Sequence, residues 1–489
     1  MSDLLTYTGL EVREHRLDTV LSYHGTSTDL NEKGKNGALV CPARYYGQCG
    51  NCPESCAETR AIIMRDAVAI SHAPLGCSSR AAEHNIAFRT VCRQRGYEVK
   101  NIRYINTNMS EKDTVYGGAE KLRLAIREAD TRYRPKAIFV LSSCAAGIIG
   151  EDLESIAGEM EEELGYPVIP IPCEGFKSTV WATGFDLGYH AILWKLVKPP
   201  RKKQEDLINV FSFAQSDGFG PLLNPLGLKA NYLTDLATVE TVSYMSEAAA
   251  SVQMCTSLSM YIAHVLEERY GVPEIKVPSP FGIAWTDRWI RAVAKLTGRE
   301  ERAEKFIAAE HERIGPEYQE LCEVLGGKTI YVWGGDAWAL NIINVVKEFG
   351  MKVAGLNLNH HDVKVDSDTE KVPLDHLTEA AGEIHNTSIC NKQPFMVYKI
   401  LKNLKPDVII LRHGGNPVIC TKAGIPTIFE GDVNFGIGYE GTLHLGKHLH
   451  SVLKKKRFFE HIGEHVRLPY TNWWLNEADA FYFEGAGTK

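Results

Sequence analysis

Short apolar runs alternate with amphipathic helical stretches along most of the chain. Runs such as AVAISHA at 67–73 and KAIFVLSS at 136–143 are the length of buried strands and end near Gly, Ser, Cys or Pro. Between the runs lie helical patterns such as 151–165, with apolar residues along one face. This alternation predicts an α/β fold with parallel sheets covered by helices, in which ligands bind at the carboxyl ends of the strands.

The length of 489 residues is too great for a single hydrophobic core. The basic segment KPPRKKQED at 198–206 is typical of a linker, and a second boundary is expected near GGK at 326–328. We therefore expect three α/β domains and a C-terminal extension, with the boundaries 1–205, 206–326, 327–445 and 446–489.

Charge and hydropathy restrict the partners and the compartment. The chain has 54 basic and 61 acidic side chains, and a net charge of −7 provides no basic field for nucleic acid. The N-terminus lacks a basic segment followed by an apolar one, and the chain has no stretch of 18 apolar residues. We expect a cytoplasmic protein that binds neither nucleic acid nor membrane. In a reducing compartment the 12 cysteines are more plausible as buried thiols, metal ligands or redox groups than as disulfides.

Several cysteines stand where a metal cluster could be held. Cys77 and Cys144 each follow an apolar run, and CPARYYGQCGNCPESC at 41–56 contains four more. Iron–sulfur clusters need several thiolates that converge from backbone with small side chains, which Gly and Ser permit. A single cysteine of this kind is more often a small buried hydrophobe. Three similar contexts together favour a cluster.

Three segments resemble the α-type subunit of the nitrogenase component 1 superfamily: NCPESCAETRAIIMRDAVAISHAPLGC, VLSSCAAGIIGEDLESIAGEM and VIPIPCEGF. The resemblance covers residues 40 to 445. It implies that Cys52, Cys77 and Cys144 hold half of an 8Fe-7S P-cluster, whose remaining ligands come from a related β-type (K) subunit. The family's spacing of about 25 residues before the second cysteine selects Cys52, and Cys56 is the alternative. The resemblance assigns no definite role to Cys41, Cys49 or Cys56.

A further cysteine bears on catalysis. In QMCTSLSMYIAHVLEERYG at 253–271, Cys255 opens a helix and matches the family segment that ligates one end of the active-site cofactor. The alternative is a core residue, because apolar residues form a stripe around Cys255. The retained thiol favours a second, large iron–sulfur cofactor. The resemblance thus implies three Rossmann-like domains with parallel sheets, and clusters between domains and at the subunit interface.

The sequence departs from the nitrogenase pattern where the heterometal would be held. The family has a histidine after a Gly-Ile-Pro turn, whereas this chain has no histidine from 414 to 443. Glu430 and Asp432 could offer oxygen ligands there, although an acidic turn of this kind is more often only solvated. His360, His361 and His413, which follow predicted strands, could also reach the cofactor. The resemblance therefore implies a cofactor without molybdenum or vanadium.

A second departure concerns proton delivery. In the family, a histidine at this place hydrogen-bonds the cofactor. By the resemblance, Tyr189 stands at that position in this chain, and His190 follows it. A phenol can donate a hydrogen bond but does not titrate near neutrality as imidazole does. Tyr189, His190 and His361 are our candidate catalytic residues. Because Tyr189 stands in place of the family histidine, proton delivery during dinitrogen reduction is in doubt.

Three functions are compatible with these features. We favour a nitrogenase-like methylthio-alkane reductase that cleaves C–S bonds of small thioethers to methanethiol and a hydrocarbon. It would act as an α2β2 complex and receive electrons from an ATP-dependent 4Fe-4S reductase protein. The alternatives are a scaffold on which the iron-molybdenum cofactor is assembled, and a divergent nitrogenase α subunit.

Overall fold

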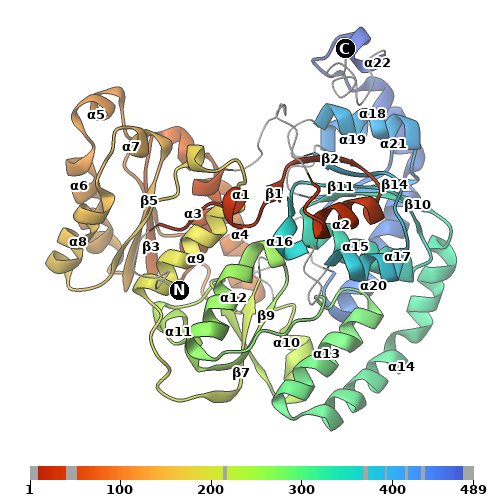
Figure 1. The fold of residues 1–489 in the computed structure, drawn as a ribbon, viewed down its shortest axis with the longest axis horizontal. Helices are drawn as coiled ribbons and strands as arrows, with labels where there is room; N and C mark the ends of the chain where they lie inside the picture. Colours follow the sequence, from red (N-terminus) through yellow and green to blue (C-terminus); the bar gives the residue numbers. More distant parts are fainter. Residues whose placement is uncertain are drawn as a thin grey trace. The chain divides into compact units, whose positions relative to one another are not determined.

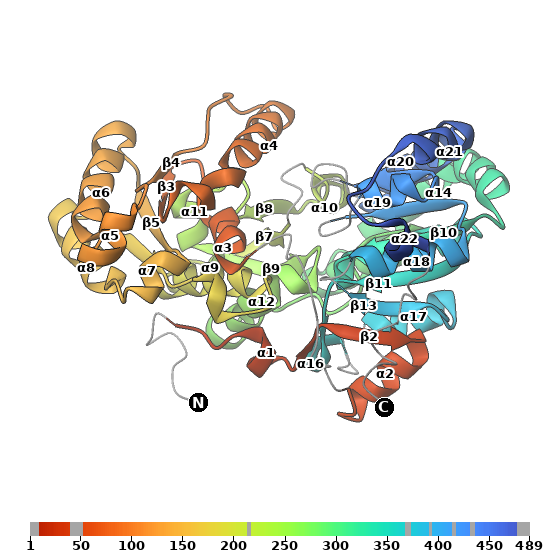
Figure 2. The ribbon, with the colours of Figure 1, turned by 90° about the horizontal axis from the view of Figure 1, so that it is seen from above.

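The computed structural model describes residues 9–39, 52–212, 217–366, 373–390, 394–412, 417–430 and 436–476. The chain forms two units, drawn in Figures 1 and 2. Unit 1 comprises Met1–Arg16, Asn51–Ile275 and Ala292–Ala303, and unit 2 comprises Leu17–Gly50, Lys276–Arg291 and Glu304–Lys489.

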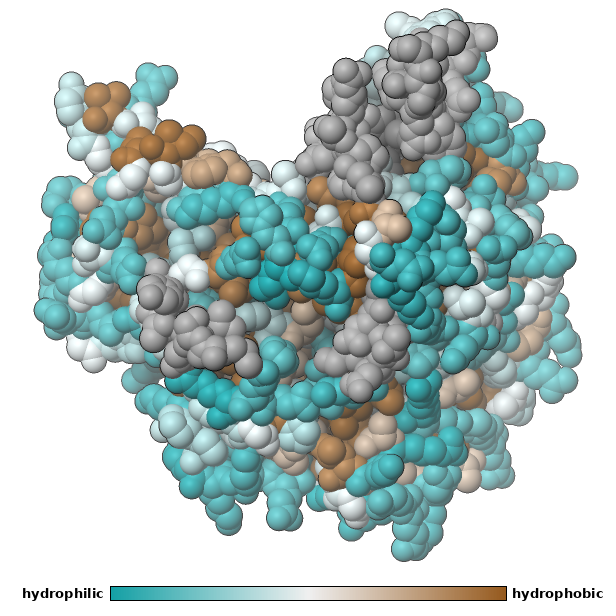
Figure 3. Space-filling model, viewed as in Figure 1, coloured by the Kyte–Doolittle hydropathy of each residue, from teal (hydrophilic) through white to brown (hydrophobic). Residues whose placement is uncertain are grey.

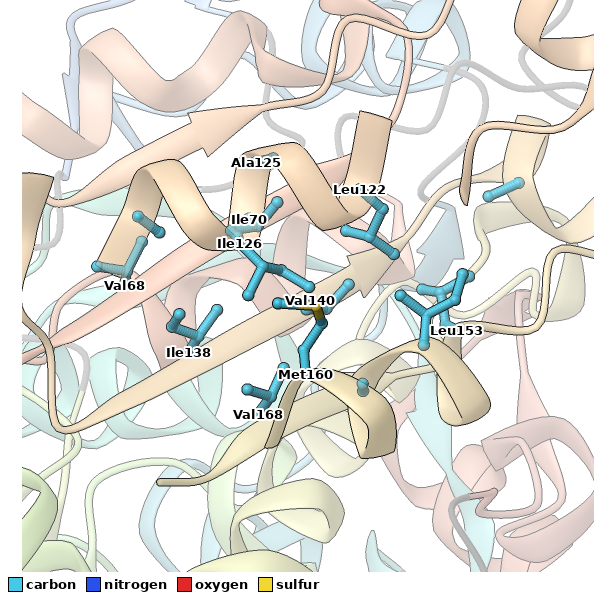
Figure 4. Packing of buried hydrophobic residues seen from close by; sticks show 14 of the residues in the cluster. Val68, Ile70, Leu122, Ala125, Ile126, Ile138, Val140, Leu153, Met160 and Val168 are labelled. Carbon is cyan, nitrogen blue, oxygen red and sulfur yellow. The ribbon is translucent and has the colours of Figure 1, made fainter. Parts of the chain in front are cut away.

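The first sheet of unit 1 has four parallel strands in the order β4-β3-β5-β6. Its strands are β3 (Ala67–His72), β4 (Tyr104–Asn106), β5 (Ala137–Ser142) and β6 (Val168–Ile171). Every residue of β3 and β5 is buried, as expected for parallel strands covered on both faces. On one face Val68, Ile70 and Val140 pack against α6 (Ala119–Tyr133) and α8 (Leu153–Leu164) (Figure 4).

Helices α3 (Pro53–Ala61) and α9 (Thr183–Lys195) pack on the opposite face of this sheet. Glycines of α9 bring the two helices close together. A β-carbon on Gly184 would lie 2.0 Å from the carbonyl oxygen of Pro53, and one on Gly188 would lie 3.2 Å from Cβ of Arg60. No larger residue fits at Gly184 without moving the backbone of α3, so this glycine allows α9 to pack closely against the first turn of α3.

The second sheet of unit 1 has three parallel strands in the order β8-β7-β9. They are β7 (Gln204–Phe211), β8 (Lys229–Leu233) and β9 (Ala248–Gln253), and α12 (Thr256–Tyr270) follows β9. The expected linker at 198–206 is firmly attached to this sheet, because β7 begins inside it and Nε of Arg201 donates to Glu247 at 2.8 Å. The boundary expected near 205 thus separates two sheets of one unit.

Unit 2 contains a six-stranded sheet in the order β15-β14-β10-β11-β13-β2. The strands are β2 (Ser22–Gly25), β10 (Thr329–Gly334), β11 (Lys352–Leu358), β13 (Thr387–Cys390), β14 (Val408–Leu411) and β15 (Thr427–Phe429). Five are parallel, and β2 runs antiparallel to β13 at one edge. The three largely parallel sheets confirm the predicted α/β fold. Residues 1–205 were expected to form one domain. Strand β2 instead joins the six-stranded sheet of unit 2, where it pairs with the side of β13 that faces away from β11.

The C-terminal boundary also differs from the expectation. Residue 445 lies inside α20 (Gly438–Leu453), because buried apolar residues continue along this helix to Leu449 and Val452. The extension then forms α21 (Lys456–His465) and α22 (Asn472–Asn476).

The remaining helices of the described residues complete both units. They are α1 (Arg13–Arg16), α2 (Ser27–Lys35), α4 (Ala81–Gln94), α5 (Glu111–Tyr116), α7 (Cys144–Ile148), α10 (Gly220–Leu223), α11 (Val239–Ser243), α13 (Ile283–Thr297), α14 (Glu300–Leu325), α15 (Asp336–Glu348), α16 (Val363–Asp366), α17 (Pro373–Ala381), α18 (Pro394–Leu404) and α19 (Pro417–Lys422). In the described ranges, no helix combines the length and the apolar character that a membrane span requires. Most of the visible surface is hydrophilic, with apolar side chains gathered over the region of α5 (Figure 3).

Candidate functional site

Three cysteines lie at junctions between elements of unit 1. Cys52 is the N-cap of α3, Cys77 lies in a 3-10 turn (Leu75–Arg80) after β3, and Cys144 is the first residue of α7 after β5. Strands β3 and β5 are parallel neighbours, and His72 is paired with Ser142 at their carboxyl ends. The two segments that carry Cys77 and Cys144 therefore leave the sheet side by side.

Gly175 marks the space between two of these thiols. It opens a short 3-10 turn (Gly175–Lys177) after β6. A β-carbon on Gly175 would lie 3.3 Å from Sγ of Cys144 and 3.8 Å from Sγ of Cys52. Cys77 lies on the neighbouring segment, in the turn after β3, the strand whose carboxyl end is paired with that of β5. We refer to Cys52, Cys77 and Cys144 as the three-cysteine site.

Without metal, the three-cysteine site disfavours thiolates. Desolvation by the surrounding protein, the neighbouring Glu54 and the other two thiols raise the pKa of Cys77 to about 12. Desolvation is also the main cause that raises the pKa of Cys52. Three adjacent thiolates therefore require a positively charged group among them, which the iron of a cluster provides. Cys52 and Cys77 are exposed and Cys144 is partly exposed, so further ligands can approach from outside the chain.

Two buried carboxyl groups accompany the three-cysteine site. Glu54 is 4% exposed, accepts a hydrogen bond from Oγ of Ser71 at 2.7 Å, and has a pKa raised by burial to about 7. Glu174 accepts from Oγ of Ser142 at 3.0 Å and pairs with Nζ of Lys177 at 2.6 Å. Sequence reasoning missed both residues. The available signal was an acidic residue close to a cysteine in each case, at Cys52 and at Cys173.

Two other cysteines of this region are enclosed by packing. Cys56 is 2% exposed, and a β-carbon on Gly184 would lie 2.8 Å from its Cβ, so its side chain faces α9. Cys173 is fully buried, and its Sγ donates to the carbonyl oxygen of Ser142 at 3.5 Å. This arrangement favours Cys52 over Cys56 as a ligand. Cys41 and Cys49 lie outside the described residues.

A cavity of about 230 Å³ adjoins the three-cysteine site within unit 1. Its wall includes Pro53, which follows Cys52, together with Glu174 and Lys177, and the apolar residues Leu10 and Leu187. Because Lys177 neutralises Glu174, the cavity offers hydrogen-bonding groups without a strong net charge.

Cys255 occupies a comparable junction in the second sheet of unit 1. It follows β9, is the N-cap of α12, and is 8% exposed. The first turn of a helix carries partial positive charge, which favours a thiolate at this position. Oγ of Ser259 donates to the carbonyl oxygen of Cys255 at 3.3 Å and fixes the local backbone. The position suits a thiolate ligand of a second cluster.

A buried ion pair holds the start of α12 in place. Asp186 of α9 accepts from Nε of Arg13 at 2.7 Å and from Nη2 of Arg13 at 2.8 Å. Arg13 also donates to the carbonyl oxygen of Ser257, and Arg16 donates to Asp186. Helix α1 thereby connects α9 with the first turn of α12. Sequence reasoning did not find this network, since its members are far apart along the chain.

Tyr189 and His190, two of the predicted catalytic residues, lie in the interior of unit 1. The hydroxyl of Tyr189 accepts from Nη1 of Arg60 at 3.3 Å, and burial raises the pKa of this phenol. The ring of Tyr189 meets that of Phe211 edge-on at 5.8 Å. Nδ1 of His190 lies 2.7 Å from the hydroxyl of Tyr261. Tyr189 is therefore a neutral hydroxyl group that retains a proton to donate.

Tyr189 is also connected to the strand that precedes Cys255. Phe211 at the end of β7 pairs with Gln253 of β9, and its carbonyl oxygen accepts from the backbone N–H of Met254 at 3.0 Å. Tyr189 therefore contacts Phe211, which is hydrogen-bonded to Met254, the residue immediately before Cys255.

The predicted site residues of unit 2 include His361 and Glu430, which the structure describes. His361 is buried in β12 (His361–Asp362), which pairs with β1 (Thr19–Val20), and Glu430 follows β15 with 8% exposure. Oε1 of Glu430 lies 3.4 Å from Nδ1 of His448, a partner that sequence reasoning missed. His413 and Asp432 lie outside the described residues.

Comparison with known proteins agrees with this arrangement. The family described as "Nitrogenase component 1 type Oxidoreductase" matches residues 52–454. The chain belongs to this family. The match begins at Cys52 and includes every residue of the three-cysteine site as well as Cys255.

Relatives of this nitrogenase component 1 chain have two kinds of name. It is 30% identical over 403 residues to the nitrogenase iron-molybdenum cofactor biosynthesis protein NifE of Methanococcus maripaludis, covering 79% of this chain and 80% of the relative. It is 30% identical over 378 residues to the nitrogenase molybdenum-iron protein alpha chain of Methanosarcina barkeri, covering 72% and 68%. A solved structure, "Nitrogenase Cp1 at pH 5", shares the fold with a TM-score of 0.70 at 23% identity, covering 88% of this chain and 92% of that one.

Proposed function

We propose that this chain is the α-type subunit of a nitrogenase-like methylthio-alkane reductase. The observation that carries the proposal is the pair of separate thiol positions in unit 1. The three-cysteine site, open to the outside around Gly175, suits a cluster completed by another subunit. Cys255, 8% exposed at a helix start, suits a second and more enclosed cluster.

The surface around the three-cysteine site supports a homologous β-type subunit as partner. Leu75, Ile148 and Phe176 are 64%, 75% and 56% exposed, and each lies within a few residues of Cys77, Cys144 or Gly175. Exposed apolar residues around an incomplete metal site are typical of a surface that another subunit covers. In an α2β2 complex the partner would supply the remaining ligands of the 8Fe-7S P-cluster.

The proposed reaction consumes two electrons and two protons. A thioether R–S–CH₃ becomes R–H and methanethiol as the R–S bond breaks, with the electrons supplied by an ATP-dependent 4Fe-4S reductase protein. A large iron–sulfur cofactor held by Cys255 would supply low-potential electrons to the substrate. In the chain itself, the neutral phenol of Tyr189, which accepts a hydrogen bond from Arg60, is a candidate proton donor on α9. An uncharged thioether is compatible with such a buried, apolar environment.

The absence of histidine from 414 to 443 supports a cofactor without a heterometal. We keep Glu430, which lies next to His448, and Asp432 as proposed oxygen ligands of this cofactor. His361 and His413 are further candidate ligands.

A scaffold for iron-molybdenum cofactor assembly is the second candidate. The similarity to NifE of Methanococcus maripaludis favours it, because this relative is named as a cofactor biosynthesis protein. A scaffold must release its cluster, whereas a reductase must retain it through many turnovers.

The decisive experiment uses the purified complex with its ATP-dependent electron donor. A reductase releases methanethiol from a small methylthio-alkane, forms little ammonia from dinitrogen, and contains no stoichiometric molybdenum or vanadium. Transfer of a cluster to cofactor-free nitrogenase without thioether reduction would establish the scaffold instead. Substantial ammonia formation would indicate a divergent nitrogenase.

Single variants separate the two clusters. Cys255→Ala should abolish methanethiol release but keep the spectroscopic signal of the P-cluster. Cys77→Ala should remove iron and weaken the association of subunits. The control is Cys322→Ala, which changes a partly exposed cysteine of α14 in unit 2. Normal turnover of Cys255→Ala would leave Cys255 as a core residue.

A further inference from the structure

The last turn of α21 in unit 2 gathers three metal-binding side chains. His461, Glu464 and His465 each offer one ligand atom, and these atoms all lie within 4.8 Å of one another. The two imidazole ring centres are 4.6 Å apart. The spacing of three and four residues places all three side chains on one face of the helix.

Hydrogen bonding leaves one nitrogen of His465 available as a ligand. Its Nδ1 lies 2.8 Å from the carbonyl oxygen of His461. A carbonyl oxygen only accepts, so Nδ1 carries the hydrogen and Nε2 keeps a lone pair. Histidines that bind metals usually donate their second ring N–H to a carbonyl or carboxylate in this way.

The neighbouring pair has the separation of two ligands on one ion. Nδ1 of His461 and Oε2 of Glu464 are 3.9 Å apart, which is too long for a hydrogen bond. Zn²⁺ lies about 2.0–2.2 Å from imidazole nitrogen and carboxylate oxygen, so one ion can contact both atoms.

The backbone of this helix is fixed by packing. A β-carbon on Gly463 would lie 2.7 Å from Cα of Gly424, so α21 rests directly on the end of α19. The side chains of His461 and Glu464 are 75% and 74% exposed on the outer face. The last turn of a helix also carries partial negative charge, which favours a bound cation.

We propose that His461, Glu464 and His465 bind one divalent transition-metal ion, with water at the remaining positions. Two imidazoles and one carboxylate select Cu²⁺, Ni²⁺, Zn²⁺ and Co²⁺ over Mg²⁺ and Ca²⁺, which prefer sets of oxygen ligands. Among divalent ions the affinity should rise from Mn²⁺ through Co²⁺ and Ni²⁺ to Cu²⁺, with Zn²⁺ below Cu²⁺. The site contains no cysteine and does not depend on either proposed iron–sulfur cluster.

The test is a calorimetric titration of the cluster-containing complex with Zn²⁺ and Ni²⁺, after weakly bound metal has been removed with a chelator. The double variant His461→Ala/His465→Ala should lose one equivalent of bound metal per chain. Glu464→Gln, which keeps the side-chain size, should weaken binding about tenfold or more. The matched control His385→Ala/His444→Ala removes two other exposed imidazoles of unit 2 and should bind as the unaltered protein does.

All five residues are exposed, so the variants should fold, which unchanged iron content and melting temperature will verify. The proposal is overturned if the double variant binds the same number of ions with the same affinity. It is also overturned if the control loses the same equivalent, or if Mg²⁺ displaces Zn²⁺ at comparable concentration.

Discussion

A β-carbon on Gly175 would lie 3.3 Å from Sγ of Cys144, so the glycine leaves open the space that this thiol faces. The same β-carbon would lie 3.4 Å from Cβ of Cys52. Carbon atoms in good contact are usually about 3.5–4.0 Å apart, so any larger residue would press on two predicted cluster ligands at once.

Gly175→Ala should therefore impair cluster binding more than folding. We expect iron per complex to fall several-fold, because the added methyl group displaces the side chains of Cys52 and Cys144. Iron analysis and the visible absorption spectrum measure this loss. Gly158→Ala in α8 is the control, since nothing lies within 4 Å of a β-carbon there. Full iron content in the Gly175→Ala complex would show that the cluster does not occupy this space.

Cys52→Ser and Cys56→Ser should have opposite effects. Cys52 is exposed beside Gly175, so its replacement should remove iron but hardly change the stability of the metal-free chain. Cys56 is 2% exposed and packed against Gly184, so Cys56→Ser must bury a more polar hydroxyl group in place of the thiol, which costs about 1–3 kcal/mol. Cys56→Ser should therefore keep iron and lower the melting temperature. If Cys56→Ser loses iron and Cys52→Ser retains it, Cys56 is the cluster ligand and Cys52 is not.

Asp186→Asn should strongly destabilise unit 1. The substitution keeps the volume of the side chain but leaves the buried guanidinium of Arg13 without its counter-charge. Breaking a buried ion pair from one side costs about 3–5 kcal/mol, which urea unfolding of the metal-free protein can measure. Glu163→Gln breaks an exposed pair with Arg127 of 2.8 Å and should leave the unfolding midpoint unchanged. Equal effects of the two variants would contradict the structural role of Asp186.

His72 should make stability depend on pH. It is fully buried, with Nδ1 3.1 Å from Oγ1 of Thr107 and Nε2 3.4 Å from Glu151, and burial lowers its pKa below the ordinary 6.5. The unfolded chain therefore takes up a proton near pH 6.5, whereas the folded chain takes it up only at lower pH. The contribution of His72 is complete above pH 6.5 and decreases as the pH falls below it.

Melting temperatures of the metal-free protein between pH 5 and pH 8 test this dependence. The His72→Gln variant should lose less stability on acidification than the unaltered chain, because the titrating group is gone. Parallel curves for the two proteins would show that His72 does not contribute.

The sequence by itself determined the class of fold and the positions of the key thiols along it. Alternating apolar runs and amphipathic stretches are local patterns, and they predict parallel strands and covering helices without knowledge of the partners. Cys77 and Cys144 were expected at strand ends, and they lie after β3 and β5. Their adjacency follows from the pairing of these two strands.

Only the tertiary structure decided contacts between segments that are distant in sequence. The pairing of β2 with β13 joins residues more than 360 positions apart, and no local pattern in Ser22–Gly25 indicates its partner. The burial of Glu54 and the link from Arg13 to Asp186 likewise depend on how α3, α9 and α1 pack.

The choice between Cys52 and Cys56 shows the physical reason most directly. Four residues apart, the two would lie on the same face if both belonged to one helix. Cys52 is instead the N-cap with an extended backbone, at φ −125° and ψ 165°, so its side chain leaves in a different direction from that of Cys56. Gly184 of α9 then covers Cys56, while Gly175 leaves room beside Cys52, and both glycines come from chain segments more than a hundred residues away.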